Sequence, residues 1–262
     1  MCILFIAIEQ HKDYPLIIAA NRDEFHQRPT LASHVWESAS HILAGKDELA
    51  NGTWMGINKF GHIAAITNIR APGREVENAI SRGGLVTDFL DHQPLPQNYH
   101  QQIKSSRQRY NGYNLLFGQL TELSVYNNFE DDLQRLTPGV YGLSNAMLNT
   151  PWPKLDAGKA ELAKYCQQDR PIDFDQLFSL LKNKQPAQDE LLPKTGVPIE
   201  WEKKLSSIFI QSPEYGTRSS TLLLINNQQH VYWQERTFNA TSDEINRVEH
   251  TFAIQDTQAE VI

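Results

Sequence analysis

The chain has 262 residues, of which 40% are hydrophobic and 21% charged, as expected for a globular protein with a substantial core. Its 31 acidic residues outnumber its 24 basic ones, and the resulting net charge of −7 argues against a general nucleic-acid-binding protein. The two cysteines, Cys2 and Cys166, are too few for a disulfide framework and favour a reducing compartment.

Targeting and cofactor motifs give no positive signal. No apolar run is long enough to cross a bilayer, and the first residues lack the basic segment and long apolar stretch of a signal peptide. No Cys-x-x-Cys or His-Glu-x-x-His pattern predicts a metal site, and no glycine-rich phosphate loop follows a strand. We therefore expect a cytoplasmic protein with no integral membrane association, no metal and no cofactor.

The first 24 residues carry the strongest local pattern. Apolar runs at 1–8 and 16–20 flank a turn that contains Pro15, which predicts an antiparallel hairpin. The second run ends in Asn21-Arg22-Asp23-Glu24, and antiparallel pairing would bring these polar residues back beside Cys2. A thiol, a guanidinium and a carboxylate would then share one small space.

That combination suits nucleophilic catalysis by Cys2. A thiol attacks efficiently only when its proton is removed. If Met1 is removed, the α-amine of Cys2 titrates near pH 8 and becomes its own base. A nearby arginine would stabilise the thiolate, and a carboxylate would hold the amine. The alternative is that Cys2 is a small buried hydrophobe and that residues 21–24 form a solvated loop.

The segments that follow alternate between turns and short apolar runs. Residues 25–46 are expected to form a long irregular loop. Hairpins are predicted at 53–58 with 62–68 and at 113–117 with 123–126, and helices at 85–90 and 98–110.

The second half adds a strand at 139–143 that ends at Ser144-Asn145, helices at 152–166 and 174–181, and a surface loop at 182–198. A helix that runs into a strand is expected at 200–210, strands at 220–225 and 231–235, and a frayed polar tail after them. Strand pairs with short turns, and helices grouped between them, predict an α+β protein with antiparallel sheets. No compositional break is visible, so we expect one domain over 1–262.

Six motifs in chain order carry a family resemblance. They are Cys2 with Asn21-Arg22-Asp23-Glu24, Asn51-Gly52-Thr53-Trp54-Met55-Gly56, Thr67-Asn68, Tyr141-Gly142-Leu143-Ser144-Asn145, Thr150-Pro151-Trp152-Pro153-Lys154 and Tyr215-Gly216-Thr217-Arg218-Ser219-Ser220-Thr221. Over nearly its whole length the chain resembles the NRDE family, also called the transport and Golgi organisation protein 2 family. That family is similar to N-terminal nucleophile hydrolases of the bile-salt hydrolase and penicillin V acylase branch.

The resemblance implies a four-layer αββα sandwich with the nucleophile at the start of the first strand. It also implies a catalytic set, namely Cys2, Asp23, Asn145 and Arg218. The hydrolases carry an arginine three residues before the aspartate, where this chain has Ala20 and instead places Arg22 further on. We expect this displacement to point Arg22 away from the direction of the hydrolase arginine.

Four further residues are candidates for substrate binding, namely Asn21, Arg22, Asn68 and Trp54. Asn145 and Asn68 each follow a strand and could donate to an oxyanion. Each candidate also has a plain structural alternative: Asn145 as a turn residue, Arg218 as a surface arginine and Trp54 as core or rim packing.

Two functional hypotheses follow. The first is an N-terminal cysteine amidohydrolase that acts on a small amide or acyl substrate. The second, which Ala20 favours, is a non-catalytic binding or trafficking protein for haem or for an acyl-CoA or lipid ligand. In both, the partner is a small molecule rather than a nucleic acid, and the sequence gives no oligomeric state.

Overall fold

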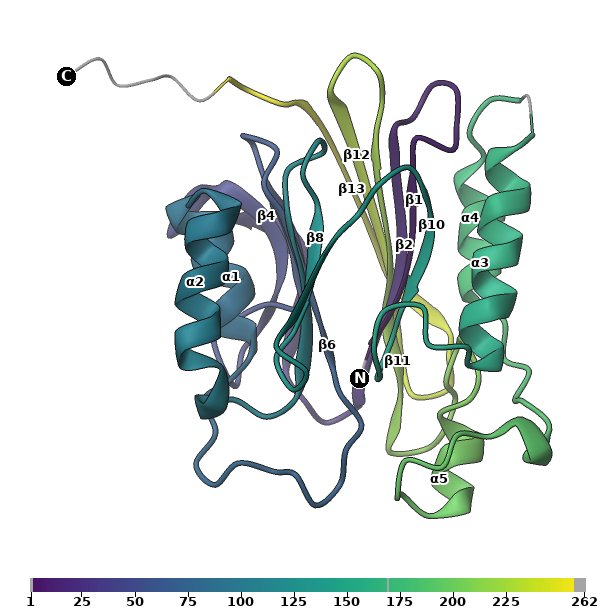
Figure 1. Cartoon of the computed structure of the whole chain (residues 1–262). Helices are drawn as coiled ribbons and strands as arrows, with labels where there is room; N and C mark the ends of the chain where they lie inside the picture. Colours follow the sequence, from purple (N-terminus) through teal and green to yellow (C-terminus); the bar gives the residue numbers. More distant parts are fainter. Residues whose placement is uncertain (1, 169, 257–262) are drawn as a thin grey trace.

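The computed structural model describes residues 2–168 and 170–256, in which two antiparallel sheets lie face to face between two helical layers (Figure 1). This arrangement confirms the predicted αββα sandwich. The first sheet has the strand order β10-β1-β2-β11-β12-β13. Its strands are β1 (Cys2–Ile8), β2 (Leu16–Phe25), β10 (Gly139–Leu143), β11 (Tyr215–Ile225), β12 (His230–Phe238) and β13 (Glu244–Ala253).

The second sheet follows the chain in order, from β3 to β9. Its strands are β3 (Thr30–Trp36), β4 (Ala39–Asp47), β5 (Met55–Asn58), β6 (Ile63–Asn68), β7 (Tyr113–Gly118), β8 (Ser124–Asn127) and β9 (Asp132–Arg135). Helices α1 (Gly83–His92) and α2 (Pro96–Ser106) cover this sheet, whereas α3 (Pro153–Cys166) and α4 (Phe174–Leu181) cover the first (Figure 1). The short helix α5 (Ile199–Lys204) lies near the end of the sandwich that holds the start of β1.

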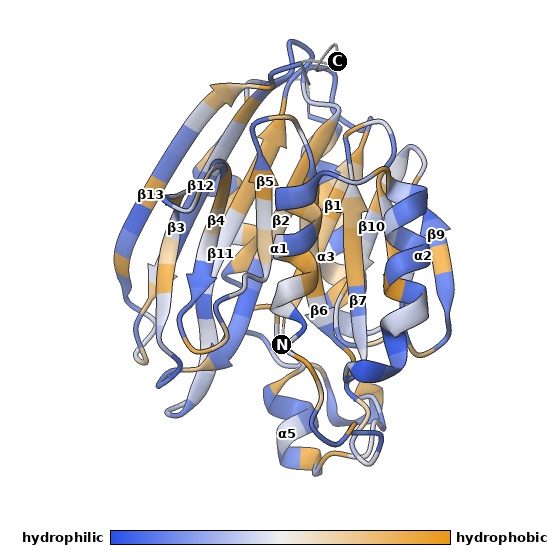
Figure 2. Ribbon diagram, turned by 90° about the vertical axis from the view of Figure 1, so that its left-hand side faces the viewer, coloured by the Kyte–Doolittle hydropathy of each residue, from blue (hydrophilic) through white to orange (hydrophobic). Residues whose placement is uncertain are grey.

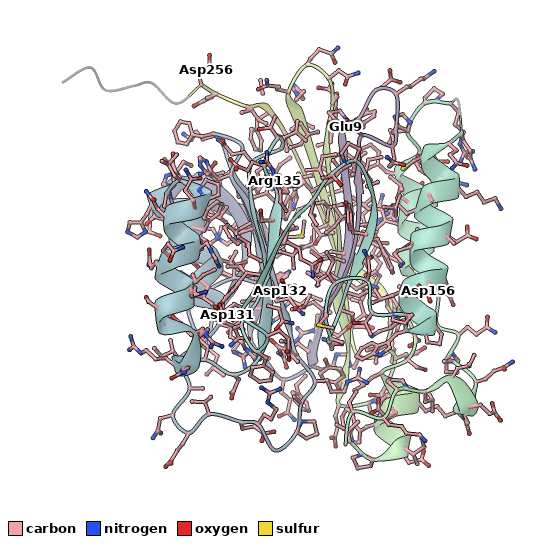
Figure 3. The ribbon with its side chains drawn as sticks, viewed as in Figure 1. Glu9, Asp131, Asp132, Arg135, Asp156 and Asp256 are labelled. Carbon is pink, nitrogen blue, oxygen red and sulfur yellow. The ribbon has the colours of Figure 1, made fainter. Side chains whose placement is uncertain are left out.

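The continuous apolar runs of β1 and β2 are explained by burial on both faces. Side chains alternate along a strand, so Leu4 and Ile18 face the other sheet while Ile3 and Ile17 face the helices. Figure 2 shows the hydrophobic strands inside the sandwich and more polar strands such as β13 at its edge. Charged side chains such as Asp156 on α3 and Arg135 on β9 lie at the surface (Figure 3).

Three expectations about the elements are wrong. Residues 25–46 are not an irregular loop, because β3 and most of β4 lie within them. The tail forms the ten-residue strand β13, which pairs with β12. After α5 the chain does not run into a strand at 205–210, since the next strand begins at Tyr215. β3 and β13 are edge strands with one hydrogen-bonded neighbour each, so backbone pairing holds them without a regular apolar pattern.

Within the described residues, no helix combines the length and the apolar character that a membrane crossing requires. The prediction that residues 1–262 form one domain stays a prediction.

Candidate functional site

The open end of the first hairpin places Cys2 directly opposite Arg22. β1 and β2 pair in antiparallel fashion from Ile8 and Leu16 up to this pair, as the sequence predicted. On the other side of β1, the Ser144 hydroxyl after β10 donates to the Cys2 carbonyl at 3.2 Å. Cys2 therefore lies at the end of the sheet, between the ends of β2 and β10.

Asn21 faces the helical layer and does not line a pocket with Cys2. Its side chain is 1% exposed. Its amide nitrogen donates to the carbonyls of Leu181 and Ile208, both at 2.9 Å, and its amide oxygen accepts from the Ser220 hydroxyl at 2.6 Å. These bonds tie the end of α4 and the segment before β11 to β2, so the structure gives Asn21 a scaffolding position.

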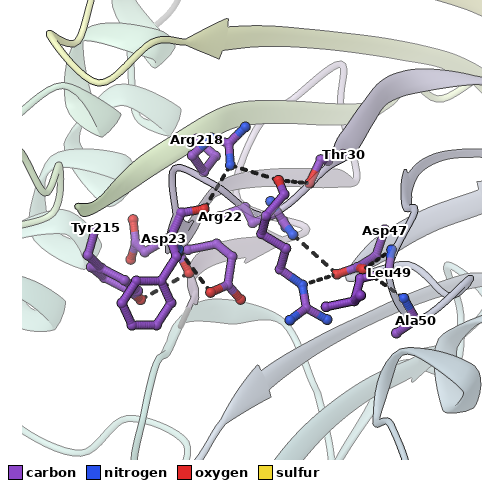
Figure 4. A network of polar contacts seen from close by, with 11 residues as sticks. Arg22, Asp23, Thr30, Asp47, Leu49, Ala50, Tyr215 and Arg218 are labelled. Atoms are coloured by element: carbon purple, nitrogen blue, oxygen red, sulfur yellow. Dashed lines mark hydrogen bonds and ion pairs between the residues drawn. The ribbon is translucent and has the colours of Figure 1, made fainter. Parts of the chain in front are cut away.

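Arg22 faces the space between the sheets, on the same side as Cys2. Its guanidinium lies 4.3 Å from the centre of the Trp54 ring, and its Nη2 is 3.4 Å from an Asp47 oxygen. The same oxygen accepts from Arg28 at 2.5 Å. Figure 4 shows Arg22 and Asp47 in this network.

The expectation that the displacement would turn this arginine aside is wrong. Ala20 and Arg22 are two residues apart on β2, and positions two apart on a strand share a face. Ala20 indeed packs in the core between the sheets, and Arg22 lines the pocket beside Cys2. The arginine has moved along the strand without changing sides.

Asp23 is buried and held by β11. Its carboxylate accepts from the Thr217 hydroxyl at 2.7 Å, and its backbone carbonyl accepts from the Tyr215 hydroxyl at 3.0 Å (Figure 4). Burial raises the pKa of Asp23 to about 6, although the Thr217 hydrogen bond and the positive charges of Lys154 and Arg22 oppose the rise. This carboxyl group therefore changes protonation close to neutral pH.

Cys2 as a residue is partly exposed, yet the surroundings of its thiol favour the protonated form. Burial raises the thiol pKa above its ordinary value, and the charge of Asp23 adds to the rise. The charge of Arg22 and a hydrogen bond from the backbone N–H of Asp23 act in the opposite direction. Attack by Cys2 would thus require a base.

Asn145 and Asn68 lie side by side near Cys2. The Asn145 amide nitrogen donates to the Asn68 carbonyl at 3.0 Å, and its amide oxygen accepts from the Ser144 hydroxyl. Asn68 ends β6 and lines the same pocket as Cys2. An amide nitrogen has two hydrogens, so Asn145 keeps one N–H beyond this bond.

The Arg218 side chain forms hydrogen bonds to backbone carbonyls and is not among the residues that line that pocket. It lies at a bulge where the pairing of β11 with β2 shifts between Thr217 and Ser219. Its Nη1 donates to the carbonyls of Phe25 at 2.9 Å and Arg28 at 3.1 Å (Figure 4). The side chain thereby fixes the segment that follows β2.

The pocket at Cys2 has a volume of about 380 Å³ and lies between the two sheets' ends. Four of the predicted site residues other than Cys2 line it, namely Arg22, Asp23, Asn68 and Trp54. It also contains three charged residues that sequence reasoning missed, Arg28, Asp47 and Arg82. Nothing marked Arg28, which belongs to the segment 25–46 read as an irregular loop, or Asp47, which directly follows that segment.

Lys154 is a further buried charge near the site that sequence reasoning missed. Its ammonium group donates to the Leu205 carbonyl at 3.0 Å. Burial lowers the pKa of Lys154 to about 8, with the charge of Arg70 acting in the same direction and that of Asp23 against it. Its place in the motif 150–154 was the available signal, but the motif served only to identify the family.

The αββα sandwich with a cysteine at the start of its first strand defines the class of fold as that of the N-terminal nucleophile hydrolases. A solved structure of this kind, the Caenorhabditis elegans N-acylethanolamine-hydrolyzing acid amidase ortholog, aligns with a TM-score of 0.52 over 86% of this chain and 92% of that one, at 12% identity. A mutant conjugated bile acid hydrolase from Clostridium perfringens aligns with a TM-score of 0.49 and 9% identity, over 100% of both chains.

The chain belongs to the Transport and Golgi organisation 2 family, whose model matches residues 1–240. It is 34% identical to the Transport and Golgi organization protein 2 homologs of Bos taurus and Homo sapiens, over 90% of this chain and 92% of each relative. The Drosophila melanogaster Transport and Golgi organization protein 2 is 27% identical over the same shares. The resemblance drawn from the six motifs is therefore confirmed.

Proposed function

We propose that this protein is a cysteine amidohydrolase of the N-terminal nucleophile type that acts on a small amide or acyl substrate. One observation carries the proposal. Cys2 begins β1 opposite Arg22, beside the buried Asp23, and opens onto a pocket of about 380 Å³. The N-terminal nucleophile fold supports it, because that fold presents a nucleophile at this position.

The reaction requires that Met1 is removed, so that Cys2 carries a free α-amine. The amine takes the thiol proton, which the raised pKa of the thiol makes necessary. The sulfur attacks the carbonyl carbon to give a tetrahedral intermediate. The carbon–nitrogen bond then breaks, and the proton leaves with the amine product. Water, activated by the freed α-amine, attacks the S-acyl-cysteine and releases a carboxylic acid and the thiol.

The surrounding residues take the remaining roles. Asp23 orients the α-amine, and Arg22 stabilises the thiolate from the opposite strand. The amide of Asn145 and that of Asn68 stabilise the oxyanion. Arg218 acts as a positioning residue, because it holds the carbonyls that follow β2.

The test is a hydrolysis screen of the purified protein against small chromogenic anilides and thioesters. Cys2→Ala should lower kcat/KM by about a thousandfold or more, as loss of a nucleophile does. Cys166→Ala is the matched control, since Cys166 is buried against α4 and away from the pocket. Equal rates for the protein and Cys2→Ala on every substrate that is turned over would refute the proposal.

The second candidate is a non-catalytic carrier of haem or of an acyl-CoA or lipid ligand. Ala20 in place of the hydrolase arginine and the raised pKa of the Cys2 thiol favour it. The test is a titration with haem, followed by its absorption spectrum, and with an acyl-CoA, followed by calorimetry. Micromolar binding that Cys2→Ala abolishes, without hydrolysis, would support a carrier. Absence of binding would count against it. The cytoplasmic location expected from the sequence stays a prediction.

A further inference from the structure

One wall of the Cys2 pocket is formed by the beginning of α1. Ser81, Arg82 and Gly83 line the pocket, and α1 begins at Gly83. The first turn of α1 contains no acidic residue, and no side chain in the described part of the chain caps its N–H groups. The start of a helix carries a partial positive charge and free N–H donors, so this wall favours a negative group.

Arg22 is a second, independent observation that points to a ligand in this pocket. The residue is 5% exposed and lines the pocket. Its Nη1 has no hydrogen-bond partner among the described residues, and its Nη2 reaches Asp47 only at 3.4 Å. A buried donor without an acceptor costs about 1–3 kcal/mol, so native proteins rarely keep one without a reason.

Arg82 supplies a second positive charge on the same pocket. Its Nη1 donates to the Gly112 carbonyl at 3.0 Å. Within residues 2–168 and 170–256, the guanidinium of Arg82 forms no other hydrogen bond. Arg82 and Cys2 line the same pocket, where burial lowers the pKa of Arg82 and the charges of Cys2 and Glu24 raise it. Nε and Nη2 of Arg82 remain for a ligand.

Among the described residues, the carboxylates of the pocket form no ion pair with Arg82 and only a 3.4 Å contact with Arg22. The Asp47 carboxylate accepts from Arg28 at 2.5 Å. It also accepts from the backbone N–H groups of Leu49 at 3.1 Å and Ala50 at 3.0 Å. Asp23 is directed to Thr217, and its raised pKa makes it partly neutral near pH 6. Glu24 accepts from the backbone N–H of Phe25 at 2.9 Å and is the remaining acid of this wall.

We propose that Arg22, Arg82 and the start of α1 bind an anionic group of the substrate, a carboxylate, sulfonate or phosphate, in the pocket onto which Cys2 opens. The role of Cys2 in chemistry rests on the proposed function, whereas the anion site rests on the arrangement of these donors. The substrate class becomes an amide or acyl compound that carries a negative charge near its scissile bond.

The test compares the alkylation of Cys2 by iodoacetate, which is anionic, and iodoacetamide, which is neutral. In both reactions a sulfur–carbon bond forms, iodide leaves and the thiol proton goes to solvent. Both rates depend equally on the thiolate fraction, so their ratio reports the local charge. We expect the iodoacetate-to-iodoacetamide ratio at Cys2, measured by peptide mass, to exceed that of free mercaptoethanol by about threefold to tenfold at low salt. The excess should vanish near 1 M salt.

Variants assign the effect to the wall. Arg82→Gln should lower the ratio at Cys2 by about threefold or more, whereas Arg135→Gln, an exposed arginine on β9, should leave it unchanged. A ratio equal to that of mercaptoethanol in the unchanged protein, or an equal ratio in Arg82→Gln and Arg135→Gln, would overturn the proposal.

Protection of Cys2 from alkylation by small anions tests the anion site even if Arg82→Gln does not fold. At constant ionic strength, inorganic phosphate, methanesulfonate and acetate should each slow the alkylation of Cys2, and the strongest protector identifies the anion preferred. No protection by any of them up to the highest concentration would overturn the anion site. Hydrolytic failure with protection intact would refute only the proposed function.

Discussion

Asn21 and Arg22 are adjacent on β2, yet they serve opposite layers of the sandwich. Asn21 faces the helices, where its three hydrogen bonds satisfy both ends of its amide. Arg22 faces the gap between the sheets, where its Nη1 has no partner among the described residues. One short signature thus contains a residue that holds the scaffold and a residue that faces a ligand pocket.

The hydrogen bonding of the two side chains separates a structural residue from a ligand-binding one within a single motif. Buried polar groups in native proteins are almost always hydrogen-bonded, so a saturated side chain is explained by folding alone. An unsaturated one at a pocket is explained by what binds there. At the end of β2, Asn21 on the helix side has hydrogen-bond partners for both ends of its amide. Arg22 on the pocket side has a donor without a partner among the described residues.

The largest effect is expected on the helix side. Asn21→Ala removes the donors to Leu181 and Ile208 and the acceptor for Ser220, all in buried positions. The free energy of unfolding should fall by about 4 kcal/mol in a urea titration, because each group left unpaired costs about 1–3 kcal/mol. Asn98→Ala, at an exposed site of α2, is the control. A loss below about 1 kcal/mol would contradict the scaffolding position given to Asn21.

Asp23 belongs both to the scaffold, through its bond to Thr217, and to the pocket, which it lines. Its titration is therefore expected to affect stability. Its pKa is about 6 in the folded protein and near 3.9 in an unfolded chain, so the native state holds the proton more tightly. The associated stability is present below pH 4 and is lost as pH rises to 6, by about 3 kcal/mol. Asp23→Asn should abolish this loss in unfolding free energies measured from pH 4 to 7. The exposed Asp156→Asn should keep it, and an equal slope in both variants would contradict the account.

Two glycines on the pocket side form a matched pair. A Cβ at Gly52 would lie 2.6 Å from the Gly83 carbonyl carbon, whereas a Cβ at Gly84 would meet no atom of the described residues within 4 Å. Gly52→Ala should therefore cost about 2 kcal/mol and weaken the protection of Cys2 by phosphate. Gly84→Ala should be neutral or stabilising by up to about 1 kcal/mol, since alanine favours a helix. Thermal unfolding of both variants checks the pair, and equal midpoints would disprove the tight contact.

The smallest effect is expected at Arg218. Arg218→Gln removes the donor to the Phe25 and Arg28 carbonyls, which are partly solvated, so stability should fall by about 1 kcal/mol. The iodoacetate-to-iodoacetamide ratio at Cys2 should stay within about twofold of that in the unchanged protein. A larger fall in that ratio than in Arg82→Gln would move the anion site toward Arg218.

The sequence predicted the core of the fold better than its edges. β1, β2 and β7 are buried on both faces, so their apolar runs are visible without a structure. The edge strands β3, β9 and β13 are stabilised by backbone hydrogen bonds to one neighbour, and most of their side chains are exposed or half-buried. No hydrophobic pattern marks such strands, and two of them were read as loop or tail.

The parts of the site that were predictable from the sequence are those close together along the chain or within a recognised motif. The hairpin register brings Arg22 to Cys2, and this followed from two apolar runs and a turn. The position of Arg82 on the same pocket as Cys2 could not be predicted, because it depends on how the second sheet and α1 pack against the first. The scaffolding position of Asn21 was hidden for the same reason, since its partners lie 160 and 187 residues away.

The most direct test of the central claim is the intact mass of the native protein before and after reaction with an acylating probe such as an activated thioester. We expect that Met1 is absent and that one acyl group is added, mapped to Cys2 and lost again on incubation in water. A retained Met1 together with an unmodified Cys2 would contradict the N-terminal nucleophile mechanism.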